Sequence, residues 1–159
     1  MNKIFENWKR FLIEDMYEPR TITFDFDDTI MMTRPDEDWG TVVDGPNEKI
    51  IELMKKHKEN NDRVLIVTSR MQKNETGGRW EKEHPAYMPS VQEYIEEHGL
   101  PVEQVVFTNG DLKAQHLLRL RSDLHFDDDE EELAEANKVG IKTIRVRNMH
   151  YVEGPKKEQ

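Results

Sequence analysis

TITFDFDDT, residues 21–29, decides the fold of this chain. An apolar run typical of a buried strand ends there on Asp25 and Asp27, two carboxylates one residue apart. Side chains two residues apart on an extended chain point to the same side, and open parallel sheets hold ligands at the carboxyl ends of their strands. The stretch therefore predicts an α/β protein in which one carboxylate attacks a phosphate ester and the other moves a proton.

Composition limits the kind of protein. The 159 residues suit one domain, and no apolar run among them reaches membrane-spanning length. Residues 1–10 lack a signal-peptide core, so we expect a cytoplasmic protein without membrane partners. The sequence has no cysteine, which excludes thiol chemistry and favours oxygen-ligated metals. The net charge of −10 argues against an extended nucleic-acid surface, although a small pocket for a nucleotide or a strand end remains compatible with it.

Strand and helix patterns alternate along the chain. Apolar runs predict strands at 21–24, 64–67, 104–107, 123–126 and 141–146, and helical spacing with stop signals predicts helices at 4–17, 47–58, 89–98, 112–120 and 130–139. Residues 31–45 form a polar stretch, and residues 71–88 are expected to be a loop or short insertion. This order predicts a single three-layer α/β/α, Rossmann-like domain over residues 1–147, with a five-stranded, mainly parallel sheet and a polar surface tail at 148–159.

Four polar groups follow the predicted strands or begin the next helix. They are Asp25 to Thr29, Thr68 to Arg70, Lys113, and Asp127 to Asp129. Because the carboxyl ends of parallel strands meet along one edge of a sheet, we expect these groups to form one site. The histidines are scattered and are assigned no catalytic role, and His125 is expected to pack within its strand.

The order of these groups resembles the haloacid dehalogenase-like (HAD) phosphohydrolases over about residues 21–146. FDFDDTI at 24–30 resembles the first motif of that superfamily, LIVT at 65–68 the second, Lys113 the third and FDD at 126–128 the fourth. The resemblance implies a HAD-like phosphatase domain. Residues 1–17 would add an N-terminal helix, and residues 71–88 would form a loop near the substrate.

The resemblance also implies a role for each matched residue. Asp25 would be the nucleophile that forms an aspartyl-phosphate. Asp27 would protonate the leaving oxygen and then deprotonate the hydrolytic water. Thr68 would donate a hydrogen bond to the transferring phosphoryl group, and Lys113 would offset its charge. Thr29 would brace the loop.

A metal ion belongs to the same implied site. A carboxylate that attacks a phosphate dianion brings like charges together, so a hard cation is needed. The implied ion is Mg²⁺, held by Asp25, by the backbone carbonyl of Asp27 and by Asp127 or Asp128.

Each of these residues has a structural alternative. Asp25 and Asp27 fit a turn or a helix cap, and Thr68 fits the cap of a chain reversal. Lys113 fits an ordinary helix-surface lysine. The acidic run at 127–132 fits the positive end of the next helix.

The segments around the predicted site narrow the substrate. The gap at 31–45 is short, so the chain looks like a capless or minimally capped member with an open site. TSR at 68–70, followed by a polar insertion, is similar to the 3′-phosphatase domain of phage-type polynucleotide kinase-phosphatases. That similarity implies that Ser69, Arg70 and Arg79 bind substrate, and that Trp80 or Trp39 stacks on a base. The alternative for Arg79 and Trp80 is a solvated loop.

The sequence thus predicts a Mg²⁺-dependent phosphomonoesterase with an aspartyl-phosphate intermediate. Its expected substrates are nucleotides or 3′-phosphorylated nucleic-acid ends. A 5′-nucleotidase or sugar-phosphate phosphatase is the second enzyme hypothesis, and mononucleotide turnover as good as oligonucleotide turnover would favour it. A binding or scaffold protein on an inactive HAD fold is the hypothesis from another class.

Overall fold

A computed structural model describes residues 18–76 and 78–152 of the chain. In these residues a five-stranded sheet has the order β5-β4-β1-β6-β7, and every neighbouring pair in it is parallel. Its strands are β1 (Thr21–Phe24), β4 (Arg63–Thr68), β5 (Gln104–Phe107), β6 (Leu124–Asp127) and β7 (Thr143–Arg145). The predicted α/β class and the parallel sheet are confirmed, and the strand order is compatible with a Rossmann-like fold.

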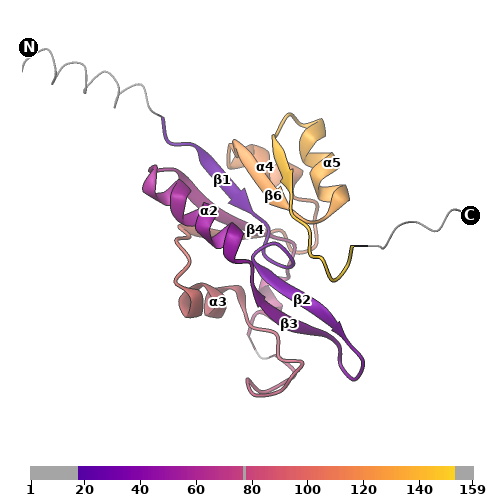
Figure 1. Ribbon diagram of the computed structural model, residues 1–159. Coiled ribbons are helices and arrows are strands. Elements are labelled where there is room, and N and C mark those ends of the chain that lie inside the picture. Colours follow the sequence, from indigo (N-terminus) through magenta and orange to yellow (C-terminus); the bar gives the residue numbers. More distant parts are fainter. Residues whose placement is uncertain (1–17, 77, 153–159) are drawn as a thin grey trace, which may run out of the picture.

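Helices cover both faces of this sheet (Figure 1). On one face α2 (Glu48–Glu59) and α3 (Val91–His98) pack on β1 and β4, and Phe24 stacks on Phe126 of β6 at 4.7 Å between ring centroids. On the other face α4 (Ala114–Arg119) and α5 (Glu130–Lys138) pack against Val67 through Leu117 and Ala136. The apolar runs of the central strands are therefore buried on both sides, as expected of parallel strands.

Capping side chains decide where several helices begin. The side chain of Asn47 accepts a hydrogen bond from the backbone N–H of Ile50, so α2 begins at Glu48. Ser90 caps α3 in the same way, so that this helix begins two residues later than the sequence predicts. Gly99 ends α3 in the left-handed conformation, with φ 59°, which glycine adopts without strain.

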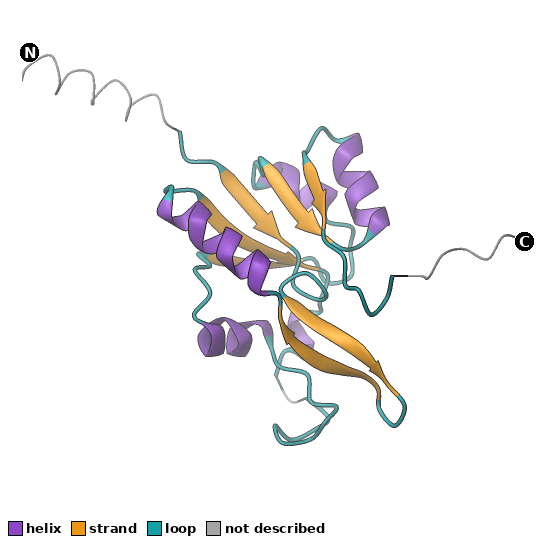
Figure 2. Ribbon diagram, in the orientation of Figure 1, coloured by secondary structure: helices purple, strands orange, loops and turns teal. Residues whose placement is uncertain are grey.

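Residues 31–46 form a hairpin, which the sequence analysis did not predict. β2 (Met31–Asp36) pairs antiparallel with β3 (Gly40–Pro46), with a register shift after Met32. The hairpin projects from the carboxyl-end side of the parallel sheet (Figures 1 and 2). Its polar, proline-containing sequence lacks the alternation of apolar and polar residues that marks a half-buried strand. The outer half of the hairpin is held by pairing between its strands rather than by burial of side chains. The described residues of the segment 71–88 are loop, as predicted, except for the short 3-10 helix η1 (Gln72–Asn74).

Residues 149–152 of the C-terminal segment are exposed, and the segment is anchored at Asn148. Asn148 is only 7% exposed and donates to Asp28 Oδ1 at 2.8 Å and to the carbonyl of Thr33 at 2.7 Å. These bonds tie the segment to the base of the hairpin. The predicted helix at 4–17 lies outside the described residues. Among the described helices, none combines the length and the apolar character needed to span a membrane.

Candidate active site

Asp25 lies directly after β1, the central strand, and is 5% exposed. Its backbone N–H donates to the carbonyl of Phe126 at 2.8 Å, which continues the pairing with β6 by one residue. The chain then turns sharply, and the carbonyl of Phe26 accepts from the backbone N–H of Ile30 at 3.0 Å. This turn returns the Thr29 hydroxyl to Asp25, where it donates to Oδ2 at 3.0 Å. Thr29 therefore braces the turn and orients the carboxylate.

Lys113 is a buried cation rather than a surface lysine. Its Nζ donates to Asp25 Oδ1 and to Asp127 Oδ2, both at 2.7 Å, and the residue is 2% exposed. Burial alone would lower the pKa of Lys113, but the charges of the two carboxylates outweigh it and raise that pKa. Its backbone N–H donates to Glu132 Oε2 at 2.9 Å, which fixes the start of α4 against α5. The lysine is thus held as a charged bridge between two strand ends.

Three carboxylates meet at this point. Asp25, Asp127 and Asp128 each offer one oxygen, and these oxygens lie within 4.8 Å of one another. Burial raises the pKa of Asp25 well above its usual range, and the charge of Asp127 adds to this effect although Lys113 opposes it. Burial together with the charges of Asp127 and Asp28 raises the pKa of Asp128 to about 6. An all-carboxylate oxygen set of this kind fits a hard divalent cation, which would offset the cost of burying these negative charges close together.

Asp127 differs from the other two carboxylates because its pKa is lowered rather than raised. Burial would raise its pKa, but a hydrogen bond from His125 and the charge of Lys113 lower it to about 2. His125 is fully buried, with Nε2 2.8 Å from Asp127 Oδ2 and Nδ1 2.8 Å from the hydroxyl of Thr23. His125 packs within its strand as predicted, but it also orients a carboxylate of the site. Its position two residues before Asp127 on one strand is the sequence signal for this contact.

The acidic run at 127–132 contains residues that stabilise the start of α5 and residues that belong to the carboxylate cluster. Asp129 caps α5 by accepting from the backbone N–H of Glu132 at 3.1 Å, and Glu130 lies in the first helical turn. These residues stabilise the helix end. Asp127 and Asp128, in contrast, face the cluster at Asp25.

Thr68 and Ser69 end the neighbouring strand β4 at the same edge. Thr68 is fully buried, and its Oγ1 accepts from the backbone N–H of Arg70 at 3.3 Å, so it does stabilise the chain reversal. Ser69 is exposed, and its carbonyl accepts from the backbone N–H of Gly110 at 2.9 Å. Both residues stand at the strand end predicted for them.

Asp27 and Arg70 form a bidentate ion pair. Nε of Arg70 donates to Asp27 Oδ2 and Nη2 to Oδ1, both at 2.8 Å. Nη1 donates to Glu75 at 3.1 Å and to the carbonyl of Pro89 at 2.8 Å, and the guanidinium lies 4.7 Å from the ring centroid of Phe26. Arg70 therefore holds Asp27 beside the carboxylate cluster, of which the Asp27 side chain is not a member among the described residues.

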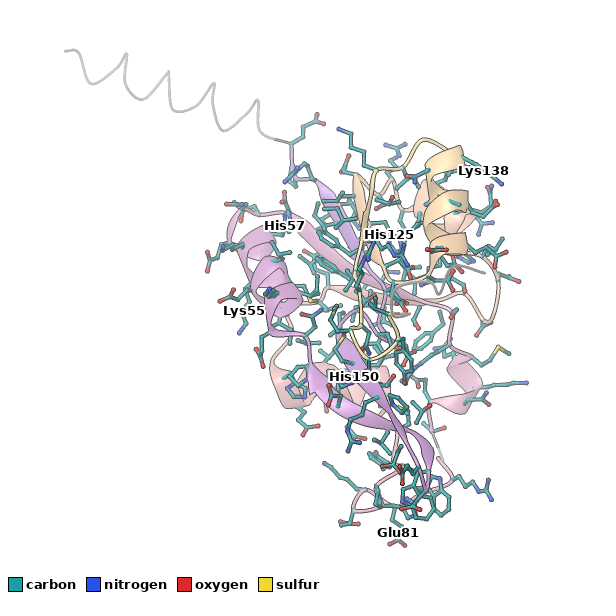
Figure 3. The ribbon with its side chains drawn as sticks, turned by 45° about the vertical axis from the view of Figure 1, so that its right-hand side comes forward. Lys55, His57, Glu81, His125, Lys138 and His150 are labelled. Carbon is teal, nitrogen blue, oxygen red and sulfur yellow. The ribbon has the colours of Figure 1, made fainter. Side chains whose placement is uncertain are left out.

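Trp80 lies in a separate aromatic cluster, which consists of Trp39, Trp80 and His84, and Arg79 lies beside this cluster. Trp80 stacks on His84 at 3.8 Å between ring centroids, and Trp39 from the hairpin tip meets both rings edge-on. Arg79 lies over Trp80 at 5.2 Å. Figure 3 shows the neighbouring Glu81 at the lower tip of the molecule, well away from His125 in the sheet. The cluster thus joins the hairpin tip to the insertion, at a distance from the carboxylates.

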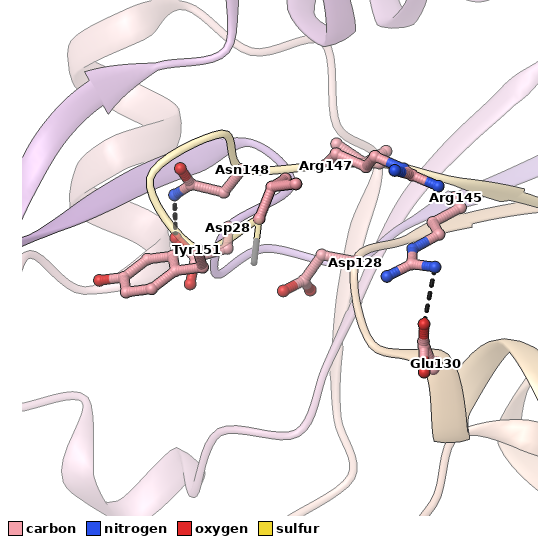
Figure 4. A pocket seen from close by; sticks show the side chains of 9 residues that line it. Asp28, Asp128, Glu130, Arg145, Arg147, Asn148 and Tyr151 are labelled. Carbon is pink, nitrogen blue, oxygen red and sulfur yellow. Dashed lines mark hydrogen bonds and ion pairs between the residues drawn. The ribbon is translucent and has the colours of Figure 1, made fainter. Parts of the chain in front are cut away.

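Two cavities flank the site, and Asp28 lines both. One, of about 530 Å³, is lined by Asp128, Arg145, Arg147 and Tyr151 among others (Figure 4). The other, of about 740 Å³, is lined by Asp27 and Arg70 among others. Asp28 itself has φ 61° and accepts from the backbone N–H of Thr33 at 2.9 Å, which fixes it at the base of the hairpin.

No protein-family model and no curated protein matches this chain. The arrangement of the site residues is therefore the basis for any functional conclusion.

Proposed function

We propose that the chain is a HAD-type, Mg²⁺-dependent phosphomonoesterase that acts through an aspartyl-phosphate on nucleotides or on 3′-phosphorylated nucleic-acid ends. One observation carries the proposal. Lys113 bridges Asp25 and Asp127 beside Asp128, at the carboxyl ends of two central parallel strands. This arrangement combines a nucleophile, a fixed positive charge and a set of oxygen ligands, which are the elements that phosphoryl transfer needs.

Asp25 is the nucleophile in this proposal. One of its carboxylate oxygens forms a bond to phosphorus while the bond from phosphorus to the ester oxygen breaks. Lys113 offsets the charge of Asp25 and of the transferring group. The Thr29 hydroxyl fixes the rotamer of Asp25, so that the attacking oxygen is positioned before the substrate arrives.

Asp27 is the proposed acid and base. It donates a proton to the leaving alcohol in the first step and accepts one from the hydrolytic water in the second. In that second step the water oxygen bonds to phosphorus while the bond between phosphorus and the Asp25 oxygen breaks, which releases inorganic phosphate and the free carboxylate. The bidentate pairing with Arg70 fixes the position and the rotation of the Asp27 carboxylate for both proton transfers.

Asp25, Asp127 and Asp128 are the proposed ligands of Mg²⁺, which would neutralise charge between carboxylates and phosphate. His125 would hold Asp127 in its ligating orientation through the hydrogen bond to Oδ2.

Phosphate release from p-nitrophenyl phosphate by the purified full-length protein tests this function. We expect turnover that requires Mg²⁺, that is lost in EDTA and that is abolished in Asp25→Ala. Borohydride reduction of protein trapped during turnover should convert residue 25 to homoserine, because an acyl phosphate is reducible and a free carboxylate is not. Asp111→Asn, which removes an exposed carboxylate, is the matched control and should keep full activity.

Full activity in Asp25→Ala would overturn the nucleophile assignment. Metal-independent turnover would contradict the proposed ligand set. Absence of hydrolysis for every ester, with Mg²⁺ present and the protein folded, would favour the binding-protein hypothesis.

A further inference from the structure

The larger cavity lies between the hairpin and the segment that follows β4. Its volume is about 740 Å³, which is within the range of pockets that bind nucleoside-sized ligands. Thr33 and Thr41 line it from the hairpin, and Met71 and Tyr87 line it from residues 71–90. Asp27 is part of its wall, so the proposed proton donor faces this space. A leaving alcohol that takes its proton from Asp27 would therefore occupy the cavity.

The charged groups of this cavity are mostly negative. Asp27, Asp28, Glu75 and Glu93 line it, and Arg70 is the cation among the lining residues that the structure describes. Arg70 is already shared between Asp27 and Glu75. Glu93 Oε1 lies 4.0 Å from Lys82 Nζ, and the four carboxylates still outnumber these two cations. The cavity therefore presents net negative charge to whatever enters it, in a protein whose net charge is −10.

The remaining lining is uncharged. Thr41, Asn74 and Thr76 offer hydroxyl and amide groups, whereas the Thr33 hydroxyl already donates to Asp28 Oδ1 at 2.7 Å. Met71 and Tyr87 provide apolar surface. Glu93 also accepts a hydrogen bond of 2.6 Å from the Tyr87 hydroxyl, so this end of the wall is held in place. Such a lining suits a ligand with hydroxyl groups and a flat or apolar part, and without negative charge.

We propose that the cavity selects phosphate esters whose alcohol is uncharged and of nucleoside size. Nucleoside monophosphates fit this description. A 3′-phosphorylated strand does not, because each further phosphodiester would bring a negative charge towards Asp28, Glu75 and Glu93. This inference rests on the proposed phosphomonoesterase function and replaces its substrate range with a narrower one.

Three substrates that carry the same reacting phosphate separate the effect of the charge of the leaving alcohol from the effect of its size. They are thymidine 3′-monophosphate, the 3′-phosphorylated thymidine dinucleotide with a phosphodiester linkage, and the same dinucleotide with an uncharged methylphosphonate linkage. We expect kcat/KM for the phosphodiester dinucleotide to be at least about tenfold below that for the methylphosphonate analogue at low salt, because like charges repel. The difference should shrink in 0.5 M NaCl, where charges about one Debye length apart are screened.

Added positive charge tests the same point from the protein side. Thr41→Lys and Thr76→Lys place a cation on the cavity wall, so the ratio of kcat/KM between phosphodiester and methylphosphonate dinucleotides should rise towards one. Gln104→Lys is the matched control. Gln104 is exposed at the amino end of β5, whereas the cavity lies at the carboxyl ends of the strands. Its substitution should therefore leave the ratio unchanged.

The outcomes separate this inference from the function on which it rests. Equal or faster turnover of the phosphodiester dinucleotide overturns the inference alone, and would assign strand binding to the cavity with Arg145 and Arg147. A rise in the ratio with Gln104→Lys as large as with Thr41→Lys also overturns it. Failure to hydrolyse p-nitrophenyl phosphate and all three thymidine esters overturns the proposed function itself.

Discussion

Arg70 holds both carboxylate oxygens of Asp27 at 2.8 Å and uses its third nitrogen on Glu75 and on the carbonyl of Pro89. All three guanidinium nitrogens are thus engaged by the protein. The resemblance noted in the sequence implied that Arg70 binds substrate. These contacts favour a role for Arg70 in positioning Asp27, because a planar fork fixes both the location and the rotation of a carboxylate.

Arg70→Lys should therefore impair catalysis more than binding. Lysine keeps the charge but offers no fork, so Asp27 would lose its fixed orientation. We expect kcat with p-nitrophenyl phosphate to fall at least about tenfold, with a smaller change in KM, because poor positioning of the acid/base acts on the transition state. Arg63→Lys, on the exposed amino end of β4, is the control. A large rise in KM with unchanged kcat would instead assign Arg70 to the substrate phosphate.

Lys113→Met should separate the structural from the chemical role of this cation. Asp25 and Asp127 would face one another without the 2.7 Å bridges, and we expect loss of about 3 kcal/mol of unfolding free energy in urea. Phosphatase activity should fall at least about 10²-fold, because the charge next to the transferring group is lost. Lys138→Met, which removes an exposed ion pair with Glu135, should change neither quantity appreciably. A stable Lys113→Met protein with full activity would contradict both roles.

The sequence predicted the parallel strands well because they are buried on both faces. A run such as residues 64–67 has to be apolar throughout, and such runs are visible without any tertiary information. The convergence of Asp25, Lys113 and Asp127 followed from the topology, since all three stand where strands end or helices begin.

The hairpin and the partners of the site residues were missed for a different reason. Pro35 and Gly45 lie in paired strands that contribute little to the core, so no apolar alternation marks them. Contacts such as those of Asn148 with Asp28 join residues 120 positions apart, and no local pattern encodes them. The same holds for the fork between Arg70 and Asp27, which depends on how two loops meet.

His125 should affect metal binding without contacting the metal. In His125→Phe the hydrogen bond to Asp127 is lost, and we expect the Mg²⁺ concentration that restores activity after EDTA treatment to rise about tenfold or more. His125→Gln, which retains a donor, should recover part of this loss. The rise in melting temperature on adding Mg²⁺ gives a second measurement that does not depend on turnover. An unchanged Mg²⁺ requirement in His125→Phe would show that the hydrogen bond serves the fold alone.

Trp39→Ala should release the insertion from the hairpin tip. Trp39 contacts both Trp80 and His84, and it is 43% exposed, so its loss opens the aromatic cluster while removing little from the core. We expect faster hydrogen exchange and faster proteolysis within residues 71–88, with a small change in melting temperature. Leu118→Ala, a similarly exposed apolar residue on α4, should leave exchange in that segment unchanged. Equal protection in Trp39→Ala and wild type would mean that the insertion is held by Arg70 and Glu75 instead.

Asn148 should contribute to stability through the two hydrogen bonds that its Nδ2 donates. Its Nδ2 reaches both the carboxylate of Asp28 and the carbonyl of Thr33, and the residue is nearly buried. Asn148→Asp puts a carboxylate against Asp28 and removes both donors, so it should cost more unfolding free energy than Asn148→Ala, which we expect to cost about 1–3 kcal/mol. Because Asp28 lies between the two cavities, Asn148→Asp should also lower kcat/KM. Raising the salt concentration should recover part of the stability of Asn148→Asp and little of that of Asn148→Ala, since only the former loses stability by repulsion. Equal urea midpoints for the two variants at low salt would contradict this account of the C-terminal segment.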